Sequence, residues 1–260
     1  KINVRTGDLV GAEALVRWNH PRAGLVFPDE FIPIAERTGL INPLTRHVIT
    51  TALSQARIWI DSGRPLPIAV NLSVRNLHDG HFAELVADLL AAHDVPAALL
   101  ELEVTESAIM IDPGRARQTL DELCALGVRL SLDDFGAGNT SLSQLTSMPF
   151  SELKIDRSFV MTMVENPGNT VIMQSVIALG HNLGLTLVAE GVETAQALVA
   201  LTEWGCDVAQ GYHISRPVAV DVFDIWSAGR HIAPPPKCGE QAVPITADVL
   251  ANLSQGAFRI

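Results

Sequence analysis

Two acidic residues stand side by side at the end of an apolar stretch. In the segment LSLDDFG, residues 130–136, Asp133 and Asp134 follow a short alternating run and precede a glycine. Adjacent carboxylates repel each other, and burying either one without a partner costs several kcal/mol. A bound cation would offset both charges, whereas an isolated pair is also typical of a strand end whose second residue caps a turn. The choice depends on whether other segments supply further ligands.

Other polar side chains lie near the ends of short apolar runs, as Asp133 and Asp134 do. They are Glu13, Asn71, Glu103, Lys154, Glu190 and Gln210. Carboxylate and amide oxygens suit hard cations such as Mg²⁺ or Mn²⁺, and the carboxylates are too many for a single ion. Two such ions typically activate water for in-line attack on a phosphodiester. The set therefore indicates metal-assisted phosphodiester chemistry, with Lys154 orienting the water or neutralising phosphate.

Short apolar runs alternate with longer segments of helical periodicity, which is typical of repeated strand and helix units around a parallel sheet. The predicted strands lie near residues 8–18, 67–73, 98–105, 129–134, 151–155, 185–190 and 207–211. The predicted helices include residues 43–63 and 169–184, with Asn169 as the expected cap of the second. We therefore predict an α/β fold with a TIM-like (β/α)8 barrel. A doubly wound open sheet is the alternative.

Side-chain alternation within these strands separates charged from apolar positions. In GAEALVR, Glu13, Leu15 and Arg17 share one face and the opposite face is apolar, and in LLELEVT Glu101 and Glu103 lie opposite apolar residues. A strand with one apolar and one charged face fits a barrel wall, and barrel enzymes hold their active sites at the carboxyl ends of the strands. We therefore expect the polar residues to meet at the barrel mouth.

Each candidate also has a purely structural alternative. Glu13 could form an ion pair with Arg17, and Lys154 could pair with Glu152 or Asp156. To exclude a metal site, all of these alternatives would have to be true at the same time. They would then leave several carboxylates close together at one barrel mouth without neutralising charges.

The composition excludes several classes of protein. The chain has 260 residues, 48% of them hydrophobic, and a formal net charge of -11, which argues against a broad surface for duplex nucleic acid. No apolar run reaches the roughly 18 residues of a membrane span, and no signal-peptide pattern opens the chain, so we expect a cytoplasmic protein. Cys124, Cys206 and Cys238 are odd in number and lack CxxC spacing, so neither a disulfide framework nor a zinc site is expected.

Seven short motifs are similar, in their order along the chain, to those of the EAL domain family of cyclic di-GMP phosphodiesterases. They are EALVR (13–17), NLS (71–73), EVTES (103–107), DDFG (133–136), KID (154–156), EGVE (190–193) and QGY (210–212). One tripeptide is weak support, but seven in register identify the chain as a member. The resemblance implies a TIM-like barrel of the EAL type over residues 1–232. Residues 233–260 are expected to be a Pro-rich linker and a short tail.

The resemblance also implies roles for individual residues. The metal ligands would be Glu13, Asn71, Glu103, Asp133, Asp134 and Glu190, with Asp133 shared between two ions. The catalytic residues would be Lys154, Glu190 and Glu13, with Lys154 and Glu190 holding and activating the attacking water. Substrate would be bound by Leu15, Arg17, Gln210 and Pro217, with Arg17 on phosphate and Gln210 also near the metal and water site. Glu106 would brace the loop after DDFG, residues 135–142.

The implied activity is hydrolysis of cyclic di-GMP to linear pGpG with Mg²⁺ or Mn²⁺, in bacterial second-messenger signalling. The implied partners are the dinucleotide, a second copy of the chain in a homodimer, and sensory or GGDEF domains of a longer protein. A catalytically silent domain that binds the dinucleotide as a receptor is the alternative, as is a dimeric interaction module. The intact set of ligands favours the enzyme.

Two departures from the family pattern limit what the resemblance implies. Asn139 and Thr140 stand where members most often carry Tyr-Ser, which affects loop packing and dimer coupling. The family's first strand, antiparallel to the strand with EAL and containing a Gln-Pro pair, is expected to be largely missing, because the chain opens at KINVRTGD. We therefore expect a fragment of a longer protein, with exposed edge groups beside the missing strand.

Overall fold

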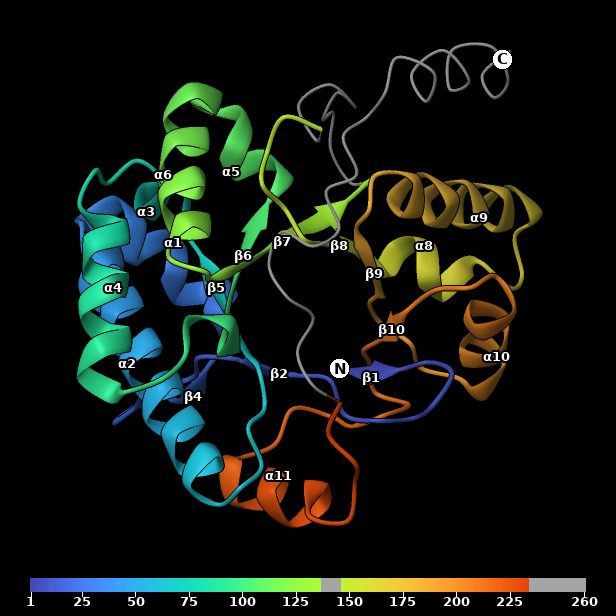
Figure 1. The fold of residues 1–260 in the computed structure, drawn as a ribbon, viewed down its shortest axis with the longest axis horizontal. Helices are drawn as coiled ribbons and strands as arrows, with labels where there is room; N and C mark the ends of the chain where they lie inside the picture. Colours follow the sequence, from blue (N-terminus) through green and yellow to red (C-terminus); the bar gives the residue numbers. More distant parts are fainter. Residues whose placement is uncertain (137–145, 234–260) are drawn as a thin grey trace.

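The computed structural model describes residues 1–136 and 146–233, and these form one barrel of strands surrounded by helices (Figure 1). Eight strands form a single sheet in the order β1-β10-β9-β8-β7-β6-β5-β2. They are β1 Ile2–Asn3, β2 Ala12–Ala14, β5 Ile68–Leu72, β6 Leu100–Thr105, β7 Arg129–Phe135, β8 Glu152–Ile155, β9 Thr186–Ala189 and β10 Val208–Ala209. All neighbours are parallel except β1 and β10. Expectation and structure agree on a TIM-like barrel.

Helices follow most of the strands and lie outside the sheet in Figure 1. They are α1 Pro28–Thr38, α2 Ile41–Asp61, α3 Val74–Leu77, α4 Phe82–His93, α5 Glu106–Met110, α6 Pro113–Ala125, α8 Arg157–Thr162, α9 Pro167–Asn182, α10 Ala195–Glu203 and α11 Val220–Ser227, with a 3₁₀ helix at Ala97–Leu99. The cap predicted for α9 is wrong, because Asn166 accepts a hydrogen bond from the Gly168 amide and starts the helix three residues earlier. None of the helices in the described ranges has the length and apolar character that crossing a membrane requires.

The strand predicted over residues 8–18 is broken in the structure. β2 covers only Ala12–Ala14, and the chain then leaves the barrel for a hairpin of β3 Trp18–His20 and β4 Gly24–Val26. The face predicted for Glu13, Leu15 and Arg17 therefore does not continue past β2, since Leu15 lies outside the strand and is 40% exposed. Sequence alternation cannot detect such a break, because Val16 and Trp18 continue the apolar face of Ala12 and Ala14 past the end of β2.

The antiparallel first strand is present as the two-residue β1, which takes the eighth position of the sheet. Its other side faces the segment that leads into β2, and two hydrogen bonds join this segment to Lys1, the residue before β1. The Val10 amide donates to the Lys1 carbonyl at 3.0 Å, and the Lys1 nitrogen donates to the Gly11 carbonyl at 2.9 Å. Backbone groups at the position where exposed edge groups were expected are therefore partly paired with the segment that enters β2.

The two faces of the barrel strands differ sharply in character. Leucines such as Leu102, Leu132 and Leu153 are fully buried in one apolar cluster with residues of the surrounding helices. The alternate positions of the same strands carry buried charges, including Glu103 and Lys154, each 1% exposed. The predicted alternation of apolar and charged faces is thus what places ionisable groups inside the barrel.

Candidate active site at the barrel mouth

Eight polar side chains gather at the carboxyl ends of the strands and the loops that follow them. This mouth cluster comprises Glu13, Asn71, Glu103, Asp133, Asp134, Lys154, Glu190 and Gln210. Each member comes from or directly follows one of six strands, β2, β5, β6, β7, β8 and β9, or follows β10. Because parallel strands of a barrel end at one rim, residues 197 positions apart are brought into contact, as Glu13 and Gln210 are.

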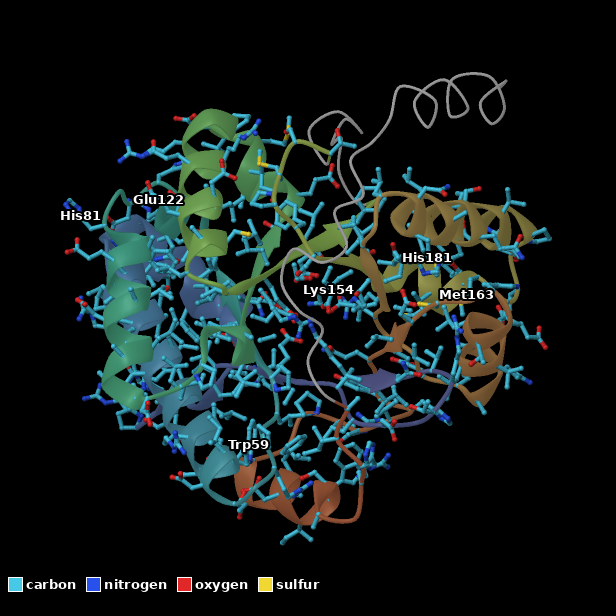
Figure 2. The ribbon with its side chains drawn as sticks, in the orientation of Figure 1. Trp59, His81, Glu122, Lys154, Met163 and His181 are labelled. Atoms are coloured by element: carbon cyan, nitrogen blue, oxygen red, sulfur yellow. The ribbon has the colours of Figure 1, made fainter. Side chains whose placement is uncertain are left out.

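Lys154 is the hub of the mouth cluster, and Figure 2 shows it at the centre of the barrel. Its ammonium nitrogen lies 2.6 Å from Glu103 Oε2, 2.7 Å from Glu190 Oε1 and 3.2 Å from Asp133 Oδ1. The side chain is 1% exposed, so these carboxylates supply the charge compensation that water cannot. The alternative pairing of Lys154 with Glu152 or Asp156 is absent from the ion pairs of the described residues, where Asp156 instead caps α8.

Glu13 is held by two amides, one from the neighbouring strand β5 and one that directly follows β10. Asn71 Nδ2 donates to Glu13 Oε1 at 2.7 Å, and Gln210 Nε2 donates to Glu13 Oε2 at 2.6 Å. Both carboxylate oxygens therefore have partners other than Arg17, whose guanidinium lies 5.2 Å from the centroid of the Phe27 ring. Gln210 Oε1 is buried and has no hydrogen-bond partner within the described ranges. A buried acceptor without a partner at this point fits a bound cation or water.

Asp133 and Asp134 both reach the mouth because the strand is irregular where they stand. In a regular strand, neighbouring side chains point to opposite faces. Here the pairing of β7 with β8 shifts register between Leu132 and Phe135, and Asp134 adopts a positive φ of 56°. As a result Asp133, Asp134 and Glu190 each bring one oxygen within 4.8 Å of the others. Aspartate tolerates this left-handed backbone better than most residues.

Burial and charge set the acidities of this site. Burial raises the pKa of Glu190 to about 7, against the opposing pull of the Lys154 ammonium. Burial also raises the pKa of Asp133 and, with the nearby charge of Asp156, that of Asp134. Burial acts in the same direction on Glu103, but the ammonium groups of Lys1 and Lys154 outweigh it and lower the pKa of Glu103.

The donors of the mouth cluster fit hard divalent cations. Carboxylate and amide oxygens are the ligands that Mg²⁺ and Mn²⁺ prefer, and no histidine or cysteine belongs to the cluster. The close approach of Asp133, Asp134 and Glu190 and the unpartnered Gln210 Oε1 both favour cation binding here.

Metal binding at this site should depend on pH through Glu190. With a pKa near 7 in the metal-free chain, the Glu190 carboxyl is largely protonated at pH 6 and ionised at pH 8. A cation must displace that proton at low pH, so the apparent Mn²⁺ affinity should rise about tenfold between pH 6 and pH 8. Titrations followed by the electron paramagnetic resonance (EPR) signal of free Mn²⁺ measure this. A Glu190→Gln variant should show a flatter profile, and an equally steep one would contradict the assignment.

The other residues predicted to touch substrate, and the residue predicted to brace the loop, lie outside the mouth cluster. Leu15 and Pro217 are exposed, and Arg17 is half-buried. Glu106 is buried at the first position of α5. Most of the loop that Glu106 was expected to brace, including Asn139 and Thr140, lies outside the described residues, as does the tail after residue 233. These roles stay predictions.

Charged residues deeper in the barrel were missed by the sequence prediction of the site. The Lys1 ammonium contacts Glu101, Glu103 and Glu152, and Arg129 contacts Glu101 at 3.0 Å and Glu152 at 3.1 Å. Alternation could have found Arg129, because it lies four residues before Asp133 on the same strand. Nothing in the sequence pattern marks Lys1, because it precedes the short β1 and its partners are about a hundred residues away or more.

Gly211 packs directly against the backbone that follows Glu190. A Cβ atom at this position would lie 2.3 Å from both the amide nitrogen and the carbonyl oxygen of Val192. Since backbone cannot shift as a side-chain end can, Gly211→Ala should lower the free energy of unfolding by about 1–3 kcal/mol. Urea unfolding measures this, with Gly229→Ala as the control because a Cβ there meets nothing within 4 Å. Equal stabilities of the two variants would contradict the close packing.

Known proteins resemble the chain along most of its length. The family model for the EAL domain matches residues 1–217. An uncharacterized signaling protein of Caulobacter vibrioides is 44% identical over 221 residues, which is 85% of this chain and 27% of that protein. The bifunctional diguanylate cyclase/cyclic di-GMP phosphodiesterase MucR of Pseudomonas aeruginosa is 40% identical over 222 residues, which is 85% of this chain and 32% of MucR. The chain thus spans a third or less of these curated relatives.

A solved structure agrees with the sequence comparisons. The PaMucR phosphodiesterase in its c-di-GMP complex matches with a TM-score of 0.82 and 40% identity, covering 85% of this chain and 90% of that chain. The likeness therefore extends over nearly the whole of the solved domain, and the matched residues include the entire mouth cluster. The chain belongs to the EAL domain family.

Proposed function

We propose that the chain hydrolyses cyclic di-GMP to linear pGpG with the help of two divalent cations, Mg²⁺ or Mn²⁺. The observation that carries the proposal is the convergence of every predicted metal ligand, together with Lys154 and Gln210, on one barrel mouth. The printed functions of MucR and its c-di-GMP complex support the choice of substrate. Substitutions among these ligands would favour a silent receptor, and none is found.

The residues would divide the work as follows. Glu13, Asn71, Glu103, Asp133, Asp134 and Glu190 would hold the cations, which when bound would supply Lewis-acid chemistry that makes water easier to deprotonate and stabilises charge on the phosphate. Lys154, next to Glu190, orients the attacking water, and the Glu190 carboxylate accepts the water proton. The water oxygen forms the new bond to phosphorus, the bond from phosphorus to the 3′ oxygen breaks, and that oxygen leaves with a proton as the 3′ hydroxyl of pGpG.

Substrate binding falls to residues around the cluster. Arg17 offers its guanidinium to a phosphate, and Leu15 and Pro217 supply exposed apolar surface to the dinucleotide. Gln210, whose Nε2 already holds Glu13, keeps Oε1 available toward substrate, water or cation. A homodimer, and sensory or GGDEF domains in a longer protein, are further proposals.

Chromatography of the products of cyclic di-GMP tests the proposal. We expect linear pGpG when Mg²⁺ or Mn²⁺ is present and none with excess chelator. Equilibrium binding of the dinucleotide is measured in parallel. Binding of cyclic di-GMP without product under all metal conditions would favour the receptor function over the enzyme. Absence of both binding and product would favour the interaction module.

A further inference from the structure

A second layer of charge lies inside the barrel beneath the mouth cluster. This inner network comprises Lys1, Glu101, Arg129 and Glu152, whose side chains are between 3% and 6% exposed. The Lys1 ammonium lies 2.7 Å from Glu152 Oε1 and also contacts Glu101. Arg129 bridges the same two glutamates from another side. The two cations and two carboxylates of this network therefore carry equal and opposite charge.

Glu103 connects the inner network to the mouth cluster. It lies two residues after Glu101 on β6, so both side chains face the interior and Glu103 is nearer the mouth. Its Oε1 accepts from Lys1 at 2.9 Å, and its Oε2 accepts from Lys154 at 2.6 Å. The two oxygens of one carboxylate are thus held by two different ammonium groups, one in each layer.

The contact of Lys1 with Glu103 distinguishes it from Arg129. Both cations neutralise Glu101 and Glu152, and both are buried. Among the ion pairs of the described ranges, only Lys1 and Lys154 reach Glu103. Lys154 belongs to the mouth itself, where water, substrate and cations would compete for its partners. Lys1 can therefore hold Glu103 from the inner network, whatever cation, water or substrate binds at the mouth.

We propose that Lys1 is a positioning residue for Glu103, whose Oε1 it holds in the inner layer so that Oε2 is directed toward the mouth. This inference rests on the proposed role of Glu103 as a metal ligand. Without Lys1, the Glu103 carboxylate can rotate away from the position that a cation requires. Partners that orient a metal ligand typically contribute 10–100-fold to metal affinity.

Removing Lys1 alone would leave three buried carboxylates undercompensated, so the test uses charge-matched pairs. Lys1→Met/Glu152→Gln removes one cation and one anion, and the Glu103 anchor is lost. Arg129→Met/Glu152→Gln removes the same charges from the same network and keeps that anchor. Mn²⁺ titration by EPR gives the metal affinity of each, and circular dichroism and urea unfolding report the fold. Glu103→Gln in the unaltered background is measured alongside.

We expect about 10–100-fold weaker Mn²⁺ binding in the Lys1 pair and a change of less than about twofold in the Arg129 pair. Equal affinities in the two pairs would overturn the role of Lys1, leaving it a structural counterion. If Glu103→Gln bound Mn²⁺ as the parent does, the metal role of Glu103 would fail instead. If the Lys1 pair does not fold, the same comparison of Mn²⁺ affinity is made between two other double variants. They are Lys1→Gln/Glu152→Gln and Arg129→Gln/Glu152→Gln.

Discussion

Asp133→Asn should lower the rate of cyclic di-GMP hydrolysis by about 10³-fold or more while the barrel stays folded. The change keeps the size of the side chain but removes the charge that two cations would share, and ligands of this kind supply much of the charge stabilisation in metal-assisted phosphoryl chemistry. Asp133 is 8% exposed and lies 3.2 Å from Lys154, so its loss also unbalances the hub. Product formation at saturating Mn²⁺ and the circular dichroism spectrum are the two measurements.

Asp112→Asn is the matched control for this prediction. Asp112 caps α6 by accepting from the Arg115 amide, and asparagine caps helices equally well. The control removes the same charge away from the mouth cluster and should retain the parent rate. A parent-like rate in Asp133→Asn itself would refute the metal assignment, because no other described residue holds its position between Lys154 and Asp134.

Lys154→Met should abolish most of the activity and also destabilise the metal-free protein by about 3–5 kcal/mol. Removing one partner of a buried charge cluster leaves the other partners without compensation, and here Glu103, Asp133 and Glu190 would all lose the ammonium. The carboxylates keep the pKa of Lys154 well above its ordinary value despite the opposing effect of burial, so the group removed is charged throughout the working pH range. In a domain of this size the melting temperature should fall by about 10 °C.

The effect on stability should depend on metal. Mn²⁺ at the mouth would neutralise the carboxylates that Lys154 leaves behind, so the loss of melting temperature should be smaller with Mn²⁺ than with chelator. Thermal unfolding under both conditions measures the difference. Arg57→Met removes a cation from an exposed ion pair with Asp61 and should leave the melting temperature nearly unchanged in both. If Lys154→Met lowered the melting temperature equally with Mn²⁺ and with chelator, the proposed closeness of cations to this ammonium would be contradicted.

The barrel could be predicted from the sequence because its signals are local. Apolar runs alternate with helical segments, and in LLELEVT the two-residue period separates Glu101 and Glu103 from the leucines. The structure places those glutamates inside and the leucines among the helices. The same argument failed past Ala14, where the chain leaves the sheet for the β3–β4 hairpin, because that departure is decided by packing rather than by alternation.

Two parts of the mouth required the folded chain. Alternation alone would send Asp133 and Asp134 to opposite faces, and only the register shift of β7 against β8 and the positive φ of Asp134 bring both to the rim. Likewise, the amides of Asn71 and Gln210 meet on Glu13 because the barrel closes. Such contacts depend on register and closure, which a sequence pattern does not encode locally.

By itself the sequence determined the barrel class, the order of its motifs and the oxygen ligands at the strand ends, because each follows from local periodicity or residue type. Only the tertiary structure decided which groups touch: Lys154 as the hub of three carboxylates, and Lys1 beneath Glu103. The physical reason is that burial brings distant charges within hydrogen-bonding distance and removes the water that would otherwise separate them.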